Sequence, residues 1–108
     1  MAEVDTDDMA NVPLIRDFKA NCNPNGEYSE IPDYMWPGIQ RYIVDRIEPG
    51  DFLTAVITNN LFAAVGSADS TNLPLIPLYV RWFYNVAPSR CWGSPRIMLE
   101  WLTGYSEE

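Results

Sequence analysis

The sequence predicts an all-α protein, a small antiparallel bundle of about four helices with an irregular acidic N-terminal arm. Apolar residues recur at three- and four-residue spacing in several segments, which is the spacing of one helix face. Proline, glycine and asparagine separate these segments and leave only short connections. Helices joined by short loops lie antiparallel and bury their apolar faces against one another, so a bundle is the expected architecture.

One domain is expected, because 108 residues are enough for one core and too few for two. We predict an acidic arm over residues 1–30 and a helical domain over residues 31–105. The arm has no sustained periodicity, and its short apolar stretch would dock through Leu14, Ile15 and Phe18. We expect this arm to be partly ordered at best, and the alternative is a disordered tail.

The first helix is expected within residues 32–47, which read PDYMWPGIQRYIVDRI. Its apolar side chains repeat at helical spacing, and Asp33 is a suitable N-cap. Pro37 must then fall in the first turn, where a missing N–H costs little. The sequence EPG at 48–50 is expected to end the helix.

Asp51 is expected to cap a second helix over residues 52–69, which read FLTAVITNNLFAAVGSAD. At the 100° per residue of a helix, its apolar side chains point in all directions around the axis. A helix that is apolar all round is buried. We therefore predict one continuous helix at the centre of the bundle.

The third helix is expected to begin at about Leu73, because Pro74 and Pro77 must both lie where few backbone N–H groups are needed. Its body reads LYVRWFYNVA and ends before Pro88. The last helix reads PRIMLEWLT and follows the tight connection CWGSP. Its predicted N-cap, first residue and C-cap are Ser94, Pro95 and Gly104.

The formal net charge of −8 excludes general nucleic-acid binding driven by attraction to phosphates. Residues 1–33 hold eight carboxylates against Arg16 and Lys19, whereas residues 81–96 hold three arginines and no carboxylate. A basic partner therefore suits the N-terminal part of the chain. A surface that attracts anions is expected near the later stretch.

The sequence contains no histidine, which removes Cys–His and Ser–His catalysis and most zinc sites. We therefore predict a protein that is not an enzyme and that takes no metal or cofactor. Cys91 is interpreted as a small buried residue at a turn. The alternative is a reactive thiolate, its pKa lowered by Arg90 and by the start of the next helix.

Cys22 and Cys91 are too few for a disulfide framework, so free thiols in a reducing cytoplasm are expected. The N-terminal sequence MAEVDTDDMANV lacks the pattern of a signal peptide. No stretch stays apolar for the roughly 18 residues of a membrane span. A soluble, cytoplasmic protein without a membrane partner is predicted.

Three consecutive aromatic residues are the strongest hint of a protein partner. Consecutive residues of a helix cannot all face one core, so at least one of the three must point outward. An outward aromatic side chain is a suitable anchor for a partner, and the carboxylates of the arm would add electrostatic attraction. The predicted partner-contact residues are Trp82, Phe83 and Tyr84 with Asp5, Asp7 and Asp8.

An anion site is a separate hypothesis for the later stretch. An outward aromatic side chain, arginines and the N–H groups at the start of the last helix would together form a stacking pocket for a nucleotide. Arginines at this density also arise by chance on a solvated face. The predicted anion-binding residues are Arg81, Arg90, Trp92 and Arg96.

The segments FLTAV followed by Asn, AD, YNVAP and CWGSP occur in this order between residues 31 and 102. Together they resemble a group of short helical proteins that tailed phages and prophages encode and that have no assigned activity. This chain departs from that pattern at Pro74 and Pro77, and its acidic arm lies outside the similar region. The resemblance implies a phage setting and a host cytoplasm.

Three functions are open at this point. The first is a non-enzymatic phage-type accessory protein that binds and inhibits a host macromolecule, including an anti-defence protein such as an inhibitor of a CRISPR effector. The second is a small-ligand binder that sequesters a nucleotide. The third is a structural or regulatory phage component that acts by self-association as a homodimer.

Overall fold

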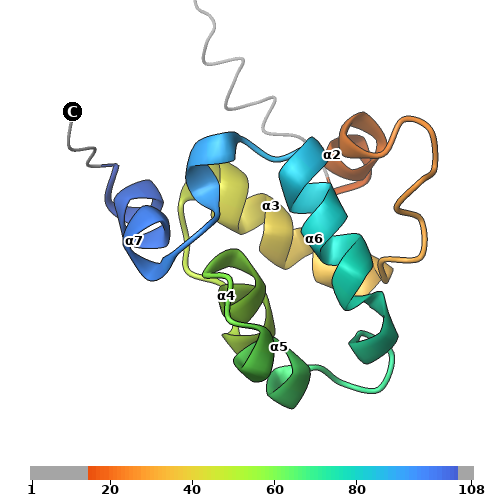
Figure 1. The fold of residues 1–108 in the computed structure, drawn as a ribbon. Coiled ribbons are helices and arrows are strands. Elements are labelled where there is room, and N and C mark those ends of the chain that lie inside the picture. The colour runs from red at the N-terminus through yellow and green to blue at the C-terminus, as the bar shows by residue number, and fades with distance from the viewer. Residues whose placement is uncertain (1–14, 105–108) are drawn as a thin grey trace, which may run out of the picture.

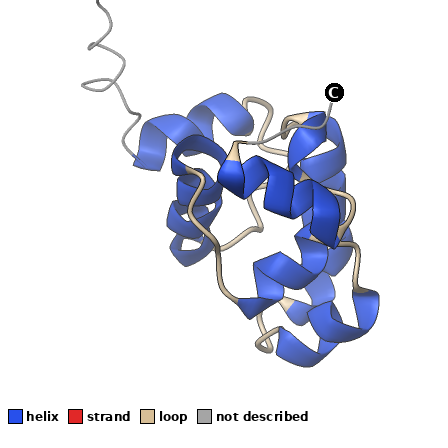
Figure 2. Ribbon diagram, turned by 90° about the vertical axis from the view of Figure 1, so that its left-hand side faces the viewer, coloured by secondary structure: helices blue, strands red, loops and turns tan. Residues whose placement is uncertain are grey.

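The computed structural model describes residues 15–104, and all regular secondary structure in this part of the chain is helical (Figures 1 and 2). The all-α class is therefore confirmed. Between residues 15 and 104 there are six α-helices, where the sequence predicted about four, and the antiparallel bundle stays a prediction. The elements are α2 (Ile15–Cys22), η1 (Asp33–Met35), α3 (Trp36–Asp45), α4 (Asp51–Ile57), α5 (Leu61–Ser67), η2 (Leu73–Leu75), α6 (Ile76–Asn85), η3 (Ser89–Cys91) and α7 (Pro95–Thr103), the η elements being 3-10 helices.

Helix α3 crosses the middle of the molecule, with α2 and α6 beside one part of it and α4 and α5 below (Figure 1). Trp36 of α3 and Trp82 of α6 are both fully buried and meet edge to face, with their ring centroids 5.7 Å apart. Phe18 of α2 also meets Trp36 edge to face, with their ring centroids 6.4 Å apart. Edge-to-face pairs of this kind add to the energy of burial. These rings form the centre of the core.

Helix α2 lies within the predicted arm, and its Phe18 side chain is buried, as the sequence suggested. The indole Nε1 of Trp82 donates a hydrogen bond to the carbonyl oxygen of Cys22 over 3.1 Å. This bond and the Phe18 contact join α2 to the core. Leu14 and the acidic residues Asp5, Asp7 and Asp8 lie outside the described residues.

Helix α3 differs from the prediction at both ends. Asp33 makes no capping hydrogen bond but lies in η1, where its Oδ1 is 2.5 Å from Nζ of Lys19. Pro37 does fall in the first turn of α3. The helix ends at Asp45 because Arg46 adopts the left-handed conformation with φ 60°, which closes the helix before EPG is reached.

The predicted continuous helix over residues 52–69 is wrong, because the chain breaks it into α4 and α5 at two asparagines. Asn59 has φ 66°, a conformation that asparagine tolerates better than most residues. The side chain of Asn60 accepts a hydrogen bond from the backbone N–H of Ala63 and caps α5. The predicted burial all round is wrong as well, since Phe62 is 93% exposed.

The ends of the last two helices follow their local signals. Pro74 and Pro77 lie in the first turns of η2 and α6, where neither removes a needed N–H. Ser94 Oγ accepts a hydrogen bond from the backbone N–H of Ile97, and Gly104 closes α7 with φ 75°. Helix α6 ends at Asn85, slightly earlier than expected.

Helix α7 is attached to the C-terminal end of α3 through Trp101. Its indole Nε1 donates to the carbonyl oxygen of Tyr42 over 3.0 Å. In return, the guanidinium of Arg46 donates to the carbonyl oxygen of Trp101 and lies 3.7 Å from the centre of the indole ring. This cation–π contact and the two hydrogen bonds fix α7 relative to α3.

Candidate functional site

An apolar groove of about 480 Å³ lies between α4, α6 and the connection that leads to α7. We call it the α4–α6 groove. Its volume is in the range of sites that hold a small ligand or a few side chains of a partner. The residues that line it are Val56, Ile57, Asn59, Val80, Arg81, Phe83, Tyr84, Trp92 and Gly93.

The groove continues toward α5 in a smaller hollow of about 60 Å³. Val56, Asn59 and Val80 line both spaces, so the two are adjacent. The hollow adds Leu61 and Ala64 from α5. An elongated apolar surface therefore runs from α5 to the connection before α7.

Tyr84 and Trp92 form the aromatic part of the groove. Their ring centroids are 5.7 Å apart at an angle of 52°, and Tyr84 is 72% exposed. The prediction that at least one of the three consecutive aromatic residues points outward is confirmed. Trp82 is 1% exposed, so it has no surface with which to contact a partner directly. Phe83 is also buried and contributes only to the lining of the groove.

Arg81 is the one charged residue among those that line the groove and its continuation. Its side chain makes no ion pair with any residue between 18 and 104. Arg96 instead pairs with Glu100 over 3.2 Å, and Arg90 lies on η3 without lining the groove. Of the four predicted anion-binding residues, the structure thus brings Arg81 and Trp92 into one site.

The connection that carries Trp92 is held by two hydrogen bonds. The backbone N–H of Gly93 donates to the carbonyl oxygen of Ile57 over 2.7 Å, and the hydroxyl of Tyr42 donates to the carbonyl oxygen of Cys91 over 2.6 Å. Gly93 has φ 134°, which favours glycine. The position of Trp92 is therefore fixed by α3 and α4.

Cys91 is fully buried, and this burial raises the pKa of its thiol to about 12. The thiol is therefore protonated at neutral pH, which supports the interpretation of a small buried residue and argues against the reactive thiolate. Burial also raises the pKa of the half-buried Cys22. Neither thiol has the environment of a nucleophile.

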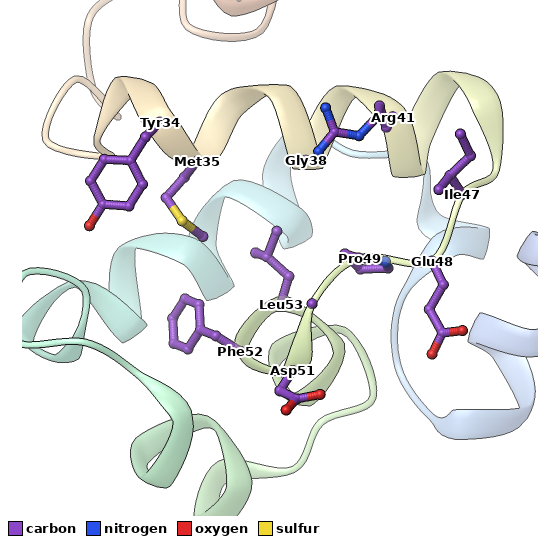
Figure 3. Close-up of a pocket in the computed structure, with 11 residues that line it drawn as sticks. Tyr34, Met35, Gly38, Arg41, Ile47, Glu48, Pro49, Asp51, Phe52 and Leu53 are labelled. Carbon is purple, nitrogen blue, oxygen red and sulfur yellow. The ribbon is translucent and has the colours of Figure 1, made fainter.

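A second pocket, of about 340 Å³, lies between α3 and the loop that leads to α4 (Figure 3). Met35, Leu53 and Phe52 provide its apolar surface. Charges of both signs surround it, from Arg41 on α3 and from acidic residues at and before the start of α4. None of the site residues predicted from the sequence lines this pocket, and it is smaller than the α4–α6 groove.

In the described part of the chain, no three histidine, cysteine or acidic side chains gather in a way that could ligate a metal ion. Over the same residues, every helix is too short or too polar to cross a lipid bilayer.

Sequence reasoning missed Val56, Asn59 and Val80, which line both the groove and its continuation. The Asn59–Asn60 pair was the available signal, because asparagine favours helix breaks and caps. Valines on a helix carry no such signal. Comparison with known protein families, with curated proteins and with solved structures found no match to this chain.

Proposed function

We propose that this protein acts by binding, as a non-enzymatic phage-type accessory protein that occupies and inhibits a host macromolecule in the host cytoplasm. An anti-defence role, such as inhibition of a CRISPR effector, is the specific form of this proposal. The partner is a host protein or protein complex, and the contact surface is the α4–α6 groove.

The exposed aromatic wall of the groove carries the proposal. Tyr84 is largely exposed and packs beside Trp92, and Arg81 lines the same groove. Tyrosine, tryptophan and arginine are the residue types in which the binding energy of protein interfaces is concentrated. An apolar groove that joins them offers a partner side chain a place to become buried.

The excess of acidic residues outside the groove supports a partner whose wider surface is basic. Among the described residues, five exposed acidic side chains make no ion pair, and the arm adds further carboxylates by sequence. Acidic residues of this kind attract a basic surface and speed the encounter with it. The five are Glu27, Glu30, Asp45, Glu48 and Asp51.

The proposal is tested with phage plaquing on hosts that carry individual defence systems, with and without the protein. We expect the wild-type protein to restore plaquing against at least one system and Val80→Asp to abolish this effect. The new carboxylate would have to lose its water when an apolar side chain of the partner enters the groove, and it would compete with the partner for Arg81. Leu99→Asp is the matched control, because Leu99 is exposed on α7 and does not line the groove. Equal activity of the two variants would exclude the groove as the contact surface.

Nucleotide binding is a second candidate, because Arg81, Tyr84 and Trp92 share one pocket. A base would stack on an aromatic ring while the guanidinium pairs with a phosphate. Isothermal titration with mono- and cyclic nucleotides decides this candidate. A lack of heat with all of them removes it.

Self-association is a third candidate, favoured by the exposed Leu61, Phe62 and Val65 of α5. Apolar side chains of one short helix that all face solvent are often covered in a dimer. Sedimentation equilibrium measures the mass directly. A monomer at all concentrations removes this candidate.

A further inference from the structure

The α4–α6 groove has a local charge opposite to that of the whole protein. The chain has a formal net charge of −8, yet residues 52–80 contain one charged residue, Asp69. Asp69 does not line the groove, and it accepts a hydrogen bond from the hydroxyl of Tyr34 over 2.7 Å. The charge that a ligand meets inside the groove is therefore that of Arg81.

Among the described side chains, no acidic group competes for Arg81. Its guanidinium has no carboxylate partner among residues 18–104, and no acidic residue in this range lines the groove or its continuation. The acidic residues elsewhere on the surface act only at a distance, where salt screens them. A guanidinium at an apolar groove forms strong, charge-assisted hydrogen bonds with a carboxylate.

We propose that the groove binds a short internal segment of a protein partner in which an apolar or aromatic side chain lies close to an Asp or Glu. The apolar side chain enters the groove beside Tyr84 and Trp92, and the carboxylate pairs with Arg81. This inference rests on the proposed function and specifies the chemistry of the partner at the contact.

The dimensions and lining of the groove suit a segment of this kind. Val56 and Val80 supply an apolar floor from α4 to α6, and Tyr84 supplies an exposed ring against which another side chain can pack. The adjoining hollow beside Leu61 extends the apolar surface along the same direction. An extended peptide can therefore place one side chain in the groove and a second toward α5.

The experiment is a selection of random peptides of about 12 residues displayed on phage, against immobilised wild-type protein and Arg81→Glu in parallel. We expect the wild-type selection to enrich peptides that combine an aromatic or apolar residue with a nearby Asp or Glu. We expect Arg81→Glu to lose this acidic preference and to favour Lys or Arg instead. Arg41→Glu is the control, because Arg41 lines the other pocket and the same charge reversal there leaves the enrichment unchanged.

The enriched peptides are then synthesised with blocked ends and titrated by fluorescence anisotropy. Replacing the peptide's Glu by Gln should weaken binding to the wild-type protein by about two- to fivefold, the scale of one exposed ion pair, and should not change binding to Arg81→Ala. Val80→Asp and Tyr84→Ala should each weaken the binding of the peptide. Circular dichroism should show that both variants keep their helical content.

Three results would overturn the inference: no enrichment of peptides, enrichment that ignores the charge at residue 81, or binding that survives Val80→Asp. The inference and the proposed function fail separately. If the enriched peptides do not depend on the charge of residue 81 but Val80→Asp still abolishes the plaquing effect, the proposed function stands and the proposed peptide chemistry is wrong. If the enriched peptides depend on the charge of residue 81 but the protein never changes plaquing, the peptide chemistry stands and the anti-defence function is wrong.

Discussion

Removal of one hydroxyl, in Tyr42→Phe, should destabilise the whole domain. Tyr42 and Cys91 are both fully buried, and the Tyr42 hydroxyl donates to the Cys91 carbonyl oxygen over 2.6 Å. The substitution leaves this carbonyl without its donor in a site that excludes water. Leaving a buried acceptor unsatisfied costs about 1–3 kcal/mol. For a domain of this size, a loss of that order lowers the melting temperature by about 4–8 °C per kcal/mol.

The measurement is urea unfolding followed by circular dichroism, in which the midpoint falls by roughly 1 M if the slope is about 1–3 kcal/mol per M. Tyr84→Phe is the matched control, since Tyr84 is largely exposed and its hydroxyl makes no hydrogen bond with the described residues. We expect this control to change the free energy of unfolding by less than about 0.5 kcal/mol. Equal effects of the two substitutions would refute the argument from the buried carbonyl.

Three further predictions concern single contacts. Asn60→Ala removes the cap of α5, which accepts from Ala63 N over 3.1 Å, and should cost about 1 kcal/mol in urea unfolding, while Asn60→Asp should retain most of it. Burial raises the pKa of the Cys91 thiol from 9.0 to about 12 in the folded state. The contribution of Cys91 to the free energy of unfolding should therefore be constant below pH 9 and should decrease as the pH rises toward 12. Cys91→Ala should make that alkaline slope shallower, and an unchanged slope would contradict the assignment. The hydrogen bond from Tyr34 lowers the pKa of Asp69 below its usual value of 3.8. The ionised Asp69 therefore stabilises the fold above pH 3.8, and this stabilisation is lost as the pH falls below that value. Asp69→Asn should flatten this acid limb in a series of thermal melts.

The ends of α7 could be predicted from the sequence, because they depend on local chemistry. Ser94, Pro95 and Gly104 each act within one turn of the helix that they begin or end. The left-handed conformation of Arg46 could not be predicted in the same way. It is stabilised by a contact with Trp101, which is 55 residues away in the chain.

The break between α4 and α5 shows where periodicity fails. Apolar residues on both sides of Asn59 fit one continuous helix, and a helical plot gives no sign of a bend. The physical cause is local, because Asn59 takes a positive φ and Asn60 caps the next helix. In this segment the pair of asparagines, and not the apolar pattern, marks where the helix breaks.

The candidate site was predictable in part. The geometry of a helix requires that one of Trp82, Phe83 and Tyr84 face outward, but which one depends on the packing of α2 and α3 against α6. Likewise, the sequence places three arginines near one another without showing that only Arg81 reaches the groove. Tertiary contacts, which leave no periodic signal, decide both questions.

Helix α5 has seven residues and buries only Ala64, so little holds it in place beyond its Asn60 cap and its packing on α4. Helices of this length do not persist on their own in water. Amide protons of Leu61–Ser67 should therefore exchange with deuterium well before those of α3 and α6, in an opening that leaves the tryptophan core intact. The α5 end of the proposed binding surface could therefore open to admit a larger side chain of a partner, while the end at the connection before α7 keeps its shape.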